Sequence, residues 1–582
     1  MNETGETLIP GGLTAASVRR WAAEAPEAVA FRGVDGAPIT YGELPAAIVG
    51  VARELAGHGI GRGDRVALLT GRGRHALSAL FGTWALGASA VLLDERHPET
   101  RLRQIVADAG CRLALSAQPG APDLGLPVLD PRQAAESGAA PTEPEWAPRS
   151  AEDEAYVIYT SGTAGKPKGV RVGAAGLETF LAAASTLDYR AGATAAVIVS
   201  PAFDGWLWCV LTTFVQGVGC VTLDSQAGPV LPQLAAHGVS ILNMTPTLYA
   251  SLGALPEAEV AVVAGERCPE PLAERLRAAA ARVINVYGPT EATIAATMAD
   301  TARGDDPACI GRALPGYVVE VVDADLRPVG AGVEGELLIG GGGVSLGYAD
   351  GGRVQPSPFV ERDGARYYRT GDLGRLRPDG QFECLGRIDD QVKVGGFRLE
   401  YGEVETLARK VPEVGDAIAY LRGTPPTVAV AVVTAEADAT AAVREQMTSG
   451  LREIFAEHLP LQVRPALIRF IAAVPVDPTT GKLARSAVEQ LPDLDAPDAD
   501  PAAAEAEQGS DTRAQVYEAW HSAFGQAIED DADFYALGGH SLLAAQLAND
   551  IGGRLGVEVT VTDVLLHPTP ALQVAVLEAR RP

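Results

Sequence analysis

The first 150 residues alternate between two hydrophobic patterns. In some segments apolar residues recur at helical spacing, and in others they form short runs rich in β-branched residues, which are typical of buried strands. The expected helices span 15–25, 39–57 and 75–87, and the expected strands span 64–69 and 90–94. Alternation of this kind predicts a parallel sheet with helices on both faces, and therefore an α/β fold. After a segment expected to cross the surface, 118–150, the alternation resumes to about residue 385.

The last ninety or so residues differ in composition from the chain before them. Residues 492–510 are rich in Pro, Ala and acidic residues, which is typical of a linker. The tail, 511–582, has apolar residues at helical spacing in three stretches, which predicts a small all-α helical bundle. Those stretches are 514–524, 542–555 and 570–579.

Charge and cysteine usage narrow the class of protein. The net charge of −27 argues against partners that are nucleic acids or anionic membrane surfaces. The six cysteines are scattered without a C-x-x-C pair, which predicts reduced core residues and neither disulfides nor a cysteine metal site. We find no signal-like N-terminus and no apolar run of membrane-spanning length, so we expect a cytoplasmic protein.

The stretch 155–172 carries the clearest candidate chemistry. It begins as a buried strand, breaks into a loop with three glycines, three hydroxyls and two lysines, and leaves as a second strand. Glycines let backbone N–H groups approach an anion, and hydroxyls and ammonium groups add donors, so the loop suits a polyphosphate. The glycine spacing and Pro167 after Lys166 are wrong for a Walker loop. An ordinary surface turn is the structural alternative.

The order of residues in this loop, Tyr-Thr-Ser-Gly-Thr-Ala-Gly-Lys-Pro-Lys-Gly, closely resembles the phosphate loop of the adenylate-forming enzymes. These are the acyl-CoA synthetases, the luciferases and the adenylation domains of nonribosomal peptide synthetases. The family usually has a second Ser or Thr where this chain has Ala164. The resemblance implies ATP binding by Thr160, Ser161, Gly162, Thr163, Gly165 and Lys168.

Further motifs resemble the same family. By that resemblance, Tyr287 in Asn-Val-Tyr-Gly-Pro-Thr-Glu stacks on adenine, Thr290 contacts phosphate and Glu291 holds Mg²⁺, an ion that prefers hard oxygen ligands. Asp372 would accept from both ribose hydroxyls, and Arg387 would reach ribose and phosphate. The motif residues Asn285 and Gly288 complete the expected ATP site. The structural alternatives are an ordinary Gly-Pro turn for the motif with Tyr287 and a polar turn that caps a strand for the motif with Asp372.

The resemblance also divides the chain. Gly-Arg-Ile-Asp-Asp-Gln-Val-Lys resembles the family hinge, with Asp389 as the hinge residue. It implies a large N-terminal subdomain, 1–388, and a small mobile α+β subdomain, 389–491. Lys482 would be the mobile lysine that bridges the substrate carboxylate and the α-phosphate, although Ala484 stands where the family has an acid. With Lys482, Glu291 and Thr290 are the expected catalytic residues.

A substrate pocket is suggested by Phe203-Asp204, since an acid among apolar residues needs a partner. In amino-acid-activating relatives an aspartate here pairs with the substrate α-ammonium, so the resemblance implies an α-amino acid. A structurally satisfied aspartate is the alternative. With Lys482, the other pocket positions are Gly205, Trp208, Asn243, Val262, Ala264, Val286, Ile294 and Ala295. This lining is mostly apolar with small walls, which favours an aromatic side chain over a large aliphatic one, and Asn243 could make one hydrogen bond.

In the tail, the run Leu-Gly-Gly-His-Ser-Leu resembles the carrier-protein site for 4′-phosphopantetheine, with Ser541 as the attachment residue. A helix N-cap serine is the alternative. Together the motifs imply a two-step reaction: an amino acid and Mg·ATP give aminoacyl-AMP, and the carrier thiol then takes the acyl group. The implied partners are a phosphopantetheinyl transferase and a condensation or tailoring enzyme, which this free-standing loading didomain would reach in trans. A small MbtH-like activator is a further candidate partner.

Two other classes remain open at this stage. The first is an acyl-CoA-synthetase-like ligase with an unrelated helical tail, which Asp204 and the Gly-Gly-His-Ser run argue against. The second is a non-catalytic carrier scaffold with a degenerate ATP site, supported only by Ala164 and Ala484.

Overall fold

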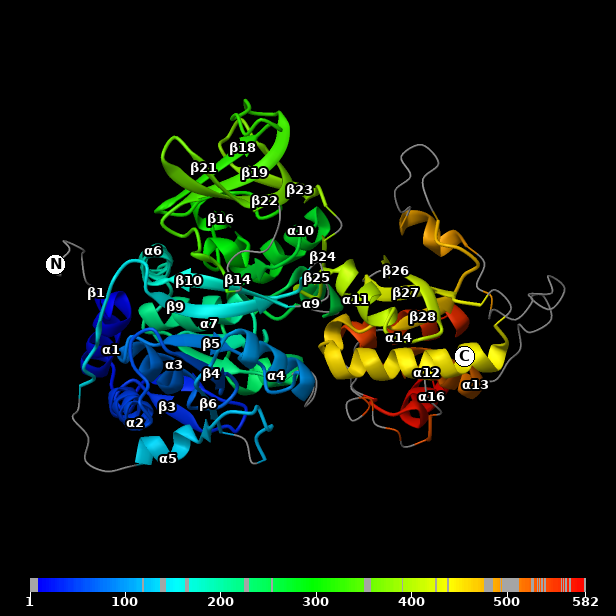
Figure 1. Ribbon diagram of the computed structural model, residues 1–582, viewed down its shortest axis with the longest axis horizontal. Coiled ribbons are helices and arrows are strands. Elements are labelled where there is room, and N and C mark those ends of the chain that lie inside the picture. The colour runs from blue at the N-terminus through cyan, green and yellow to red at the C-terminus, as the bar shows by residue number, and fades with distance from the viewer. Residues whose placement is uncertain are drawn as a thin grey trace.

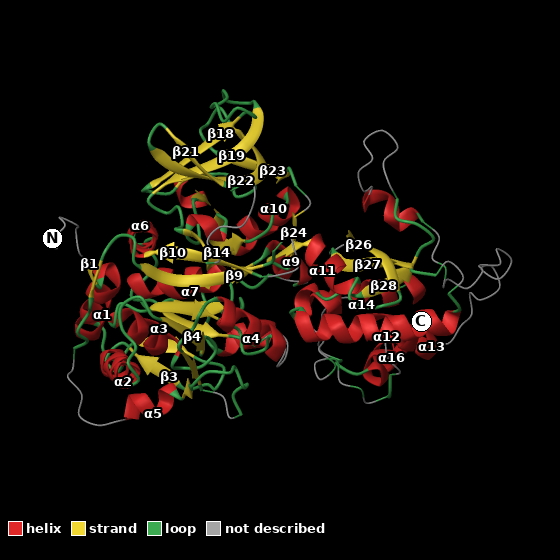
Figure 2. Ribbon diagram, viewed as in Figure 1, coloured by secondary structure: helices red, strands yellow, loops and turns green. Residues whose placement is uncertain are grey.

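Two β-sheets with helices between and around them organise the first 350 residues of the computed structural model (Figures 1 and 2). The structure describes residues 9–117, 120–136, 143–162, 167–224, 230–252, 255–349, 357–389, 391–423, 426–436, 439–475, 485–491, 494, 512–524, 528–530, 532, 534, 537, 541–555, 557, 559, 563–564 and 567–579.

The first sheet has seven strands, and its middle is parallel. In sheet order they are β20 (Gly347–Tyr348), β10 (Lys168–Gly173), β9 (Glu154–Thr160), β5 (Ser89–Leu92), β4 (Arg65–Leu69), β6 (Leu113–Ser116) and β7 (Val128–Leu129). β9, β5, β4, β6 and β7 run parallel, whereas β10 pairs antiparallel with both β9 and β20. The central strands are buried on both faces, as expected for a parallel sheet covered by helices.

The second sheet has nine strands. In sheet order they are β17 (Arg312–Ala313), β16 (Thr297–Asp300), β15 (Ala280–Tyr287), β14 (Ala258–Ala264), β13 (Ile241–Met244), β11 (Thr194–Val197), β12 (Gly219–Thr222), β2 (Val29–Arg32) and β3 (Pro38–Thr40). Its centre is parallel and both edges are antiparallel. A short pair, β1 (Ile9–Pro10) and β8 (Pro148–Arg149), lies apart from both sheets.

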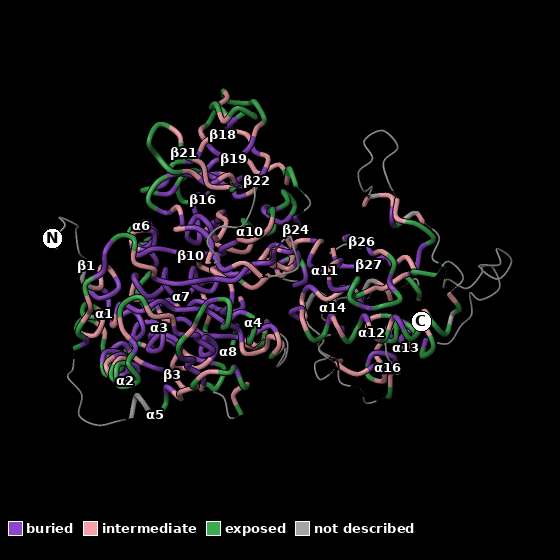
Figure 3. The backbone as a smooth tube through the Cα atoms, viewed as in Figure 1, coloured by how far each residue is buried: buried purple, intermediate pink, exposed green. Residues whose placement is uncertain are grey.

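Helices complete this large region. They are α1 (Gly12–Glu24), α2 (Leu44–Gly57), α3 (Ala76–Ala85), α4 (Glu99–Asp108), α5 (Pro131–Glu136), α6 (Ala174–Ala184), α7 (Asp204–Val215), α8 (Val230–Ala236), α9 (Pro246–Ser251) and α10 (Glu270–Ala279). Every residue of α3 and all but the first two of α7 are buried (Figure 3). Their side chains share one core with strands of both sheets, so these two helices are hydrophobic on all sides.

From residue 297 the predicted alternation is wrong. In the part of 297–400 that the structure describes there is no α-helix, and the chain forms an antiparallel sheet instead. Its strands are β18 (Tyr317–Val322), β19 (Glu334–Gly341), β22 (Ala365–Leu376), β21 (Phe359–Arg362) and β23 (Phe382–Arg387). Alternate residues of β22 are buried, the period expected of a sheet with one covered face.

The C-terminal subdomain and the tail form separate cores. The subdomain contains β24 (Gln391–Val394), β25 (Phe397–Glu400), α11 (Tyr401–Ala408), β26 (Val414–Arg422), β27 (Thr427–Thr434), α12 (Ala441–His458) and β28 (Leu467–Phe470). The tail has α13 (Thr512–Phe524), α14 (Ser541–Leu555) and α16 (Pro570–Ala579), which confirm the three predicted helices. Trp520, Phe534 and Ile551 lie at the centre of the tail's own core. The predicted linker falls almost entirely outside the described residues.

Candidate functional site

The β9–loop–β10 hairpin lies against β25 of the C-terminal subdomain. Thr160 and Ser161 are buried at the end of β9, and Lys168 begins β10. Ser161 Oγ donates to the carbonyl of Arg398 at 2.9 Å, and Lys168 Nζ lies 3.5 Å from Glu400 Oε1. Gly162 lies beside them in the chain, whereas the predicted loop residues Thr163 and Gly165 are outside the described residues, as is Lys482.

Tyr287, at the end of β15, Arg387, at the end of β23, and Asp372, within β22, form a connected group. Tyr287 Oη donates to Asp372 Oδ2 at 2.6 Å, and Arg387 Nη1 donates to Asp372 Oδ1 at 2.8 Å. Burial, together with the charge of Asp372, raises the pKa of Tyr287 well above its ordinary value, so the phenol stays a donor. The other side of Arg387 pairs with the predicted hinge residue Asp389 at 2.6 Å.

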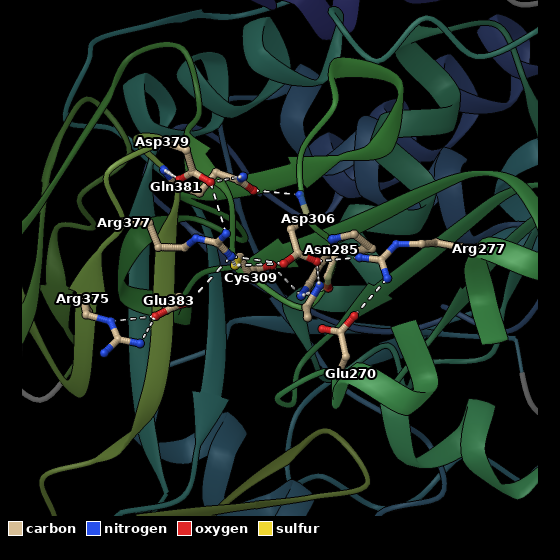
Figure 4. Close-up of polar contacts among 12 residues, drawn as sticks. Glu270, Arg277, Asn285, Asp306, Cys309, Arg375, Arg377, Asp379, Gln381 and Glu383 are labelled. Carbon is tan, nitrogen blue, oxygen red and sulfur yellow. Dashed lines mark hydrogen bonds and ion pairs between the residues drawn. The ribbon is translucent and has the colours of Figure 1, made fainter. Parts of the chain in front are cut away.

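Asn285, two positions before Tyr287 on β15, bonds to a neighbouring loop. Its Nδ2 donates to the carbonyls of Pro307 and Cys309, both at 2.9 Å (Figure 4). Arg377 crosses the same network, 3.1 Å from Asp306 Oδ2 and 2.9 Å from Cys309 Sγ. Burial raises the pKa of the Cys309 thiol to about 11, so it is protonated at neutral pH. The amide of Asn285 therefore holds the 307–309 loop that backs the cavity.

Glu291 is fully buried in the 3₁₀ turn Thr290–Ala292. Tyr348 Oη donates to its Oε1 at 2.9 Å, and Arg398 Nη1 lies 3.0 and 2.9 Å from its two oxygens. Burial raises the pKa of Glu291, but Arg398, Lys168 and the Tyr348 hydrogen bond outweigh it and hold that pKa below its ordinary value. Glu291 is ionised.

The residues after Glu291 have an unusual backbone. Thr293 and Ile294 have φ values of 53° and 72°, a region that β-branched residues rarely adopt. Thr293 Oγ1 donates to the Gly343 carbonyl at 2.6 Å, and Tyr317 Oη donates to the Thr293 carbonyl at 3.2 Å, which fixes the turn. Such strain costs roughly 1–3 kcal/mol per residue and is typical of functional sites. The turn directs Ile294 to the substrate cavity.

Asp204 is the first residue of α7 and lies partly buried in the cavity wall. Burial raises its pKa to about 6, although a hydrogen bond with Thr290 and the charge of Lys393 act in the opposite direction. Among the described residues its Oδ2 has no hydrogen-bond partner. A carboxylate in this state would gain from a cation placed beside it.

One cavity of about 230 Å³ brings together eight of the nine predicted pocket positions near α7. Those are Asp204, Gly205, Trp208, Asn243, Val262, Ala264, Val286 and Ile294. The ninth, Ala295, is buried behind Gly288, where a Cβ on the glycine would come within 2.6 Å of the Ala295 Cα. Gly396 and Phe397 of the C-terminal subdomain also line the cavity.

A second cavity, of about 680 Å³, adjoins the first and has Val286 and Gly288 in common with it. Its wall includes the predicted ATP-site residues Asn285, Tyr287, Gly288, Asp372 and Arg387. Ala548 and Val559 of the tail also line it, so the tail reaches the mouth of this cavity. α14, which begins at Ser541, packs against α9, and α9 contributes residues to both cavities.

α9 is also tied to the C-terminal subdomain. Thr247 of α9 donates through its Oγ1 to Glu266 Oε2 at 2.6 Å. The other oxygen of Glu266 accepts from the Gly396 backbone at 2.9 Å. One carboxylate therefore joins the helix to the β24–β25 turn.

Sequence reasoning missed four contributors: Tyr348, Lys393, Arg398 and Glu400. Arg398 and Glu400 are two positions apart and therefore project from the same face of β25. A pair of opposite charges on one face of a short strand, just after a Gly-Gly turn, was the available signal.

Mg²⁺ and ATP fit the residues present. Among the described residues no group of three or more His, Cys, Asp or Glu could hold a metal. Mg²⁺ in nucleotide enzymes needs only one or two carboxylates because phosphates supply further oxygens, and Glu291 offers one ionised carboxylate within the electrostatic influence of Lys168. No helix in the described part of the chain is long and apolar enough to span a bilayer.

Family comparison agrees with this geometry. Residues 18–349 match the model of the AMP-binding enzymes, and residues 514–577 match the phosphopantetheine attachment site. Novobiocin biosynthesis protein H of Streptomyces niveus is 36% identical over 566 residues, which cover 92% of this chain and 91% of that protein. Phosphinothricin tripeptide synthetase PhsC of Streptomyces viridochromogenes is 33% identical, over 91% of this chain and 50% of that protein. The chain thus spans about half of PhsC but nearly all of the novobiocin protein.

Solved structures have the same fold. Holo-PA1221, described as a nonribosomal peptide synthetase protein containing adenylation and carrier domains, matches with a TM-score of 0.75 at 24% identity, over 97% of this chain and 96% of that one. The four-domain synthetase holo-AB3403 matches with a TM-score of 0.58 at 28% identity, over 97% of this chain and 42% of that one.

Proposed function

Because the chain belongs to the AMP-binding enzymes, as an adenylation and carrier didomain of the nonribosomal peptide synthetase type that activates a substrate and loads it on its carrier, we propose that its substrate is an aromatic α-amino acid with a polar hydrogen on its side chain. The observation that carries the proposal is the cavity beside Asp204, whose carboxylate has an unpaired oxygen. Tyrosine is the first candidate.

The α-ammonium group is assigned to Asp204. The pKa near 6 leaves this carboxylate largely ionised at neutral pH but poorly solvated, so an ammonium partner stabilises it more than water does. An aryl acid or fatty acid has no such group and would leave the charge unpaired. This separates the proposal from an acyl-CoA-synthetase-like ligase.

The side-chain preference rests on Asn243. Its Nδ2 already donates to the Ala196 carbonyl at 3.1 Å, while its Oδ1 is buried and has no partner among the described residues. The Asn243 Oδ1 can therefore accept one hydrogen bond from a substrate side chain. A phenol or an indole can donate that hydrogen bond, whereas a phenyl ring cannot. Trp208 supplies a flat apolar wall, and Ala264 leaves room for a ring.

In the first half-reaction the substrate carboxylate attacks the α-phosphorus of ATP and releases pyrophosphate. Lys482 is assigned to the substrate carboxylate and α-phosphate. The remaining contacts are Thr290 to phosphate, Tyr287 to adenine, and Asp372 and Arg387 to ribose. Mg²⁺ bound at Glu291 would neutralise charge on the phosphates when present. Catalysis here is positioning and charge stabilisation, with no protein nucleophile.

For the second half-reaction, Ser541 would hold the phosphopantetheine arm, whose thiol would supply the acceptor for the aminoacyl group, with AMP as the leaving group. A phosphopantetheinyl transferase must first modify Ser541, and a downstream enzyme of the synthetase type must take the thioester. We assign the change between half-reactions to rotation of residues 389–491 about Asp389. A small MbtH-like activator is a further candidate partner.

The test is amino-acid-dependent ATP–pyrophosphate exchange with Tyr, Trp, Phe, Leu and an aryl acid. Leaving a buried acceptor unpaired costs roughly 1–3 kcal/mol, so Tyr should exceed Phe by about 10- to 100-fold in kcat/KM. Asn243→Leu should remove that preference without abolishing exchange with Phe, and Asp204→Ala should abolish exchange with both. A preference for Leu would favour the large aliphatic alternative. No exchange with any amino acid would support the carrier-scaffold reading.

A further inference from the structure

The loop from Asp306 to Ile310 forms part of the wall of the second cavity. Ala308 and Ile310 line this cavity together with Asn285 and Tyr287, two residues assigned to the ATP site. The position of the loop therefore helps to set the shape of the nucleotide site.

Asp306 is held from two sides by arginines (Figure 4). Arg277 of α10 donates through Nη2 to Asp306 Oδ1 at 2.6 Å, and Arg377, directly after β22, donates through Nη1 to Oδ2 at 3.1 Å. The Asp306 backbone N–H donates to Gln381 Oε1 at 2.9 Å. Burial raises the pKa of Asp306, but the Ala308 backbone N–H and the two arginines outweigh it and keep that pKa below its ordinary value. One ionised carboxylate thus joins α10 to the β22–β23 turn.

The effect of these ion pairs is on geometry more than on stability. The side chains of Asp306, Arg277 and Arg377 are between 28% and 37% exposed. Ion pairs that water reaches in this way contribute little to the free energy of unfolding. Two of them on one carboxylate nevertheless fix the start of a loop whose next residues line the cavity.

The loop in turn fixes the side-chain amide of Asn285. An asparagine amide has two donor hydrogens on Nδ2 and an acceptor oxygen, Oδ1. Nδ2 donates to the carbonyls of Pro307 and Cys309, both at 2.9 Å, so both hydrogens are used. No described residue donates to Oδ1, which leaves this oxygen as the acceptor for a ligand in the cavity. The reversed amide would leave both loop carbonyls without a donor.

We propose that Asp306 is a positioning residue that makes the nucleotide site selective for a purine with an exocyclic amine. Held by Arg277 and Arg377, it sets the loop carbonyls that orient the Asn285 amide, and Asn285 Oδ1 then accepts from the 6-amino group of adenine. A 6-oxo purine places an acceptor there instead, and two facing acceptors leave a buried oxygen unpaired. This inference rests on the proposed function for the assignment of the ATP site.

The first test is calorimetric titration of the full chain, in MgCl₂, with ATP and with inosine triphosphate, in which an oxygen replaces the 6-amino group. The wild type should bind ATP about 10- to 100-fold more tightly, because the analogue leaves the Asn285 acceptor unpaired. Asp306→Asn should lower this ratio by about 5- to 10-fold, since the amide is then free to reverse. Arg377→Met should lower it in the same direction, and Arg377→Lys, which keeps a charged donor, should restore most of it.

Arg362→Met is the matched control. It removes a partly buried ion pair with Glu320 from the same antiparallel sheet and should keep the wild-type ratio. If Asp306→Asn does not fold, Arg277→Met and Arg377→Met carry the test, since each leaves one ion pair intact. An unchanged ratio overturns the inference even where the affinity for ATP falls, because a merely loosened cavity loses both nucleotides alike. An equal fall in the control also overturns it.

The second test is a double-mutant cycle that asks whether Asp306 acts through Asn285. Asn285→Ala alone should remove the preference for ATP over inosine triphosphate, and Asp306→Asn added to it should not change the ratio further. A second fall that adds to the first overturns the inference. Neither test contains an amino acid, so failure of amino-acid-dependent exchange would refute the proposed substrate separately. Absence of ATP binding by the wild type would refute the ATP site and this inference together.

Discussion

Replacing Asp204 by asparagine should stabilise the protein at neutral pH while abolishing its activity. The pKa of Asp204 is raised from 3.8 to about 6, chiefly by burial. A raised carboxylate pKa means that the native state binds its proton more tightly than the unfolded state, so this group lowers stability as pH rises through the window from about 4 to 6. Each tenfold change in proton affinity corresponds to about 1.4 kcal/mol of free energy. Above pH 6 the ionised Asp204 therefore lowers the free energy of unfolding by at most about 3 kcal/mol.

The assay is thermal unfolding of the wild type and of Asp204→Asn from pH 4.5 to 8. The difference in midpoint should be smallest at the acid end and should grow to a few °C in favour of the variant above pH 6. Asp35→Asn, in an exposed turn, is the control and should show no such growth. Adding the amino acid substrate should raise the midpoint of the wild type only, because its ammonium pairs with the carboxylate. A difference that stays constant with pH, or a variant less stable at pH 8, would refute the reasoning.

Other changes give sharp expectations. Tyr287→Phe removes the 2.6 Å donor to Asp372 and should raise the KM for ATP several-fold in pyrophosphate exchange, with a smaller effect on the KM for the amino acid. Gly288→Ala forces a Cβ within 2.6 Å of backbone and should lower the thermal midpoint and exchange together. Gly61→Ala, where a Cβ meets nothing within 4 Å and the backbone is not left-handed, should leave exchange intact. Ser541→Ala should retain amino-acid-dependent exchange and lose all thioester formation, measured by mass spectrometry of the intact chain; loss of both would contradict separate half-reactions.

The parts of the site predicted from sequence are those encoded in short contiguous motifs. Three motifs can be recognised from their residue order alone, without knowledge of the fold: the loop from Thr160 to Lys168, the turn with Glu291 and the strand with Asp372. Pocket positions from Asp204 to Ile294 followed from those anchors, and eight of nine line one cavity. Their roles remain predictions.

What the sequence did not reveal depends on long-range packing. The contacts of Arg398 with Glu291 and of Glu400 with Lys168 join segments 107 and 232 residues apart, and the local charge pair on β25 does not identify these partners. The role of Asn285 also escaped, because its amide is used by a loop more than twenty positions away. The antiparallel sheet after residue 297 was misread because its strands were expected to continue the earlier alternation with helices.

The short helix α9 has a consequence for recombining modules of this kind. It lines the proposed substrate cavity and the proposed nucleotide cavity, connects through Glu266 to the C-terminal subdomain and packs against α14 of the carrier. A grafted carrier therefore changes the outer surface of an element whose inner surface lines the proposed substrate cavity. Exchange of the carrier and redesign of the cavity are therefore not independent in this chain. In a chimera, the six residues of α9 are the first that should be adapted to the new carrier.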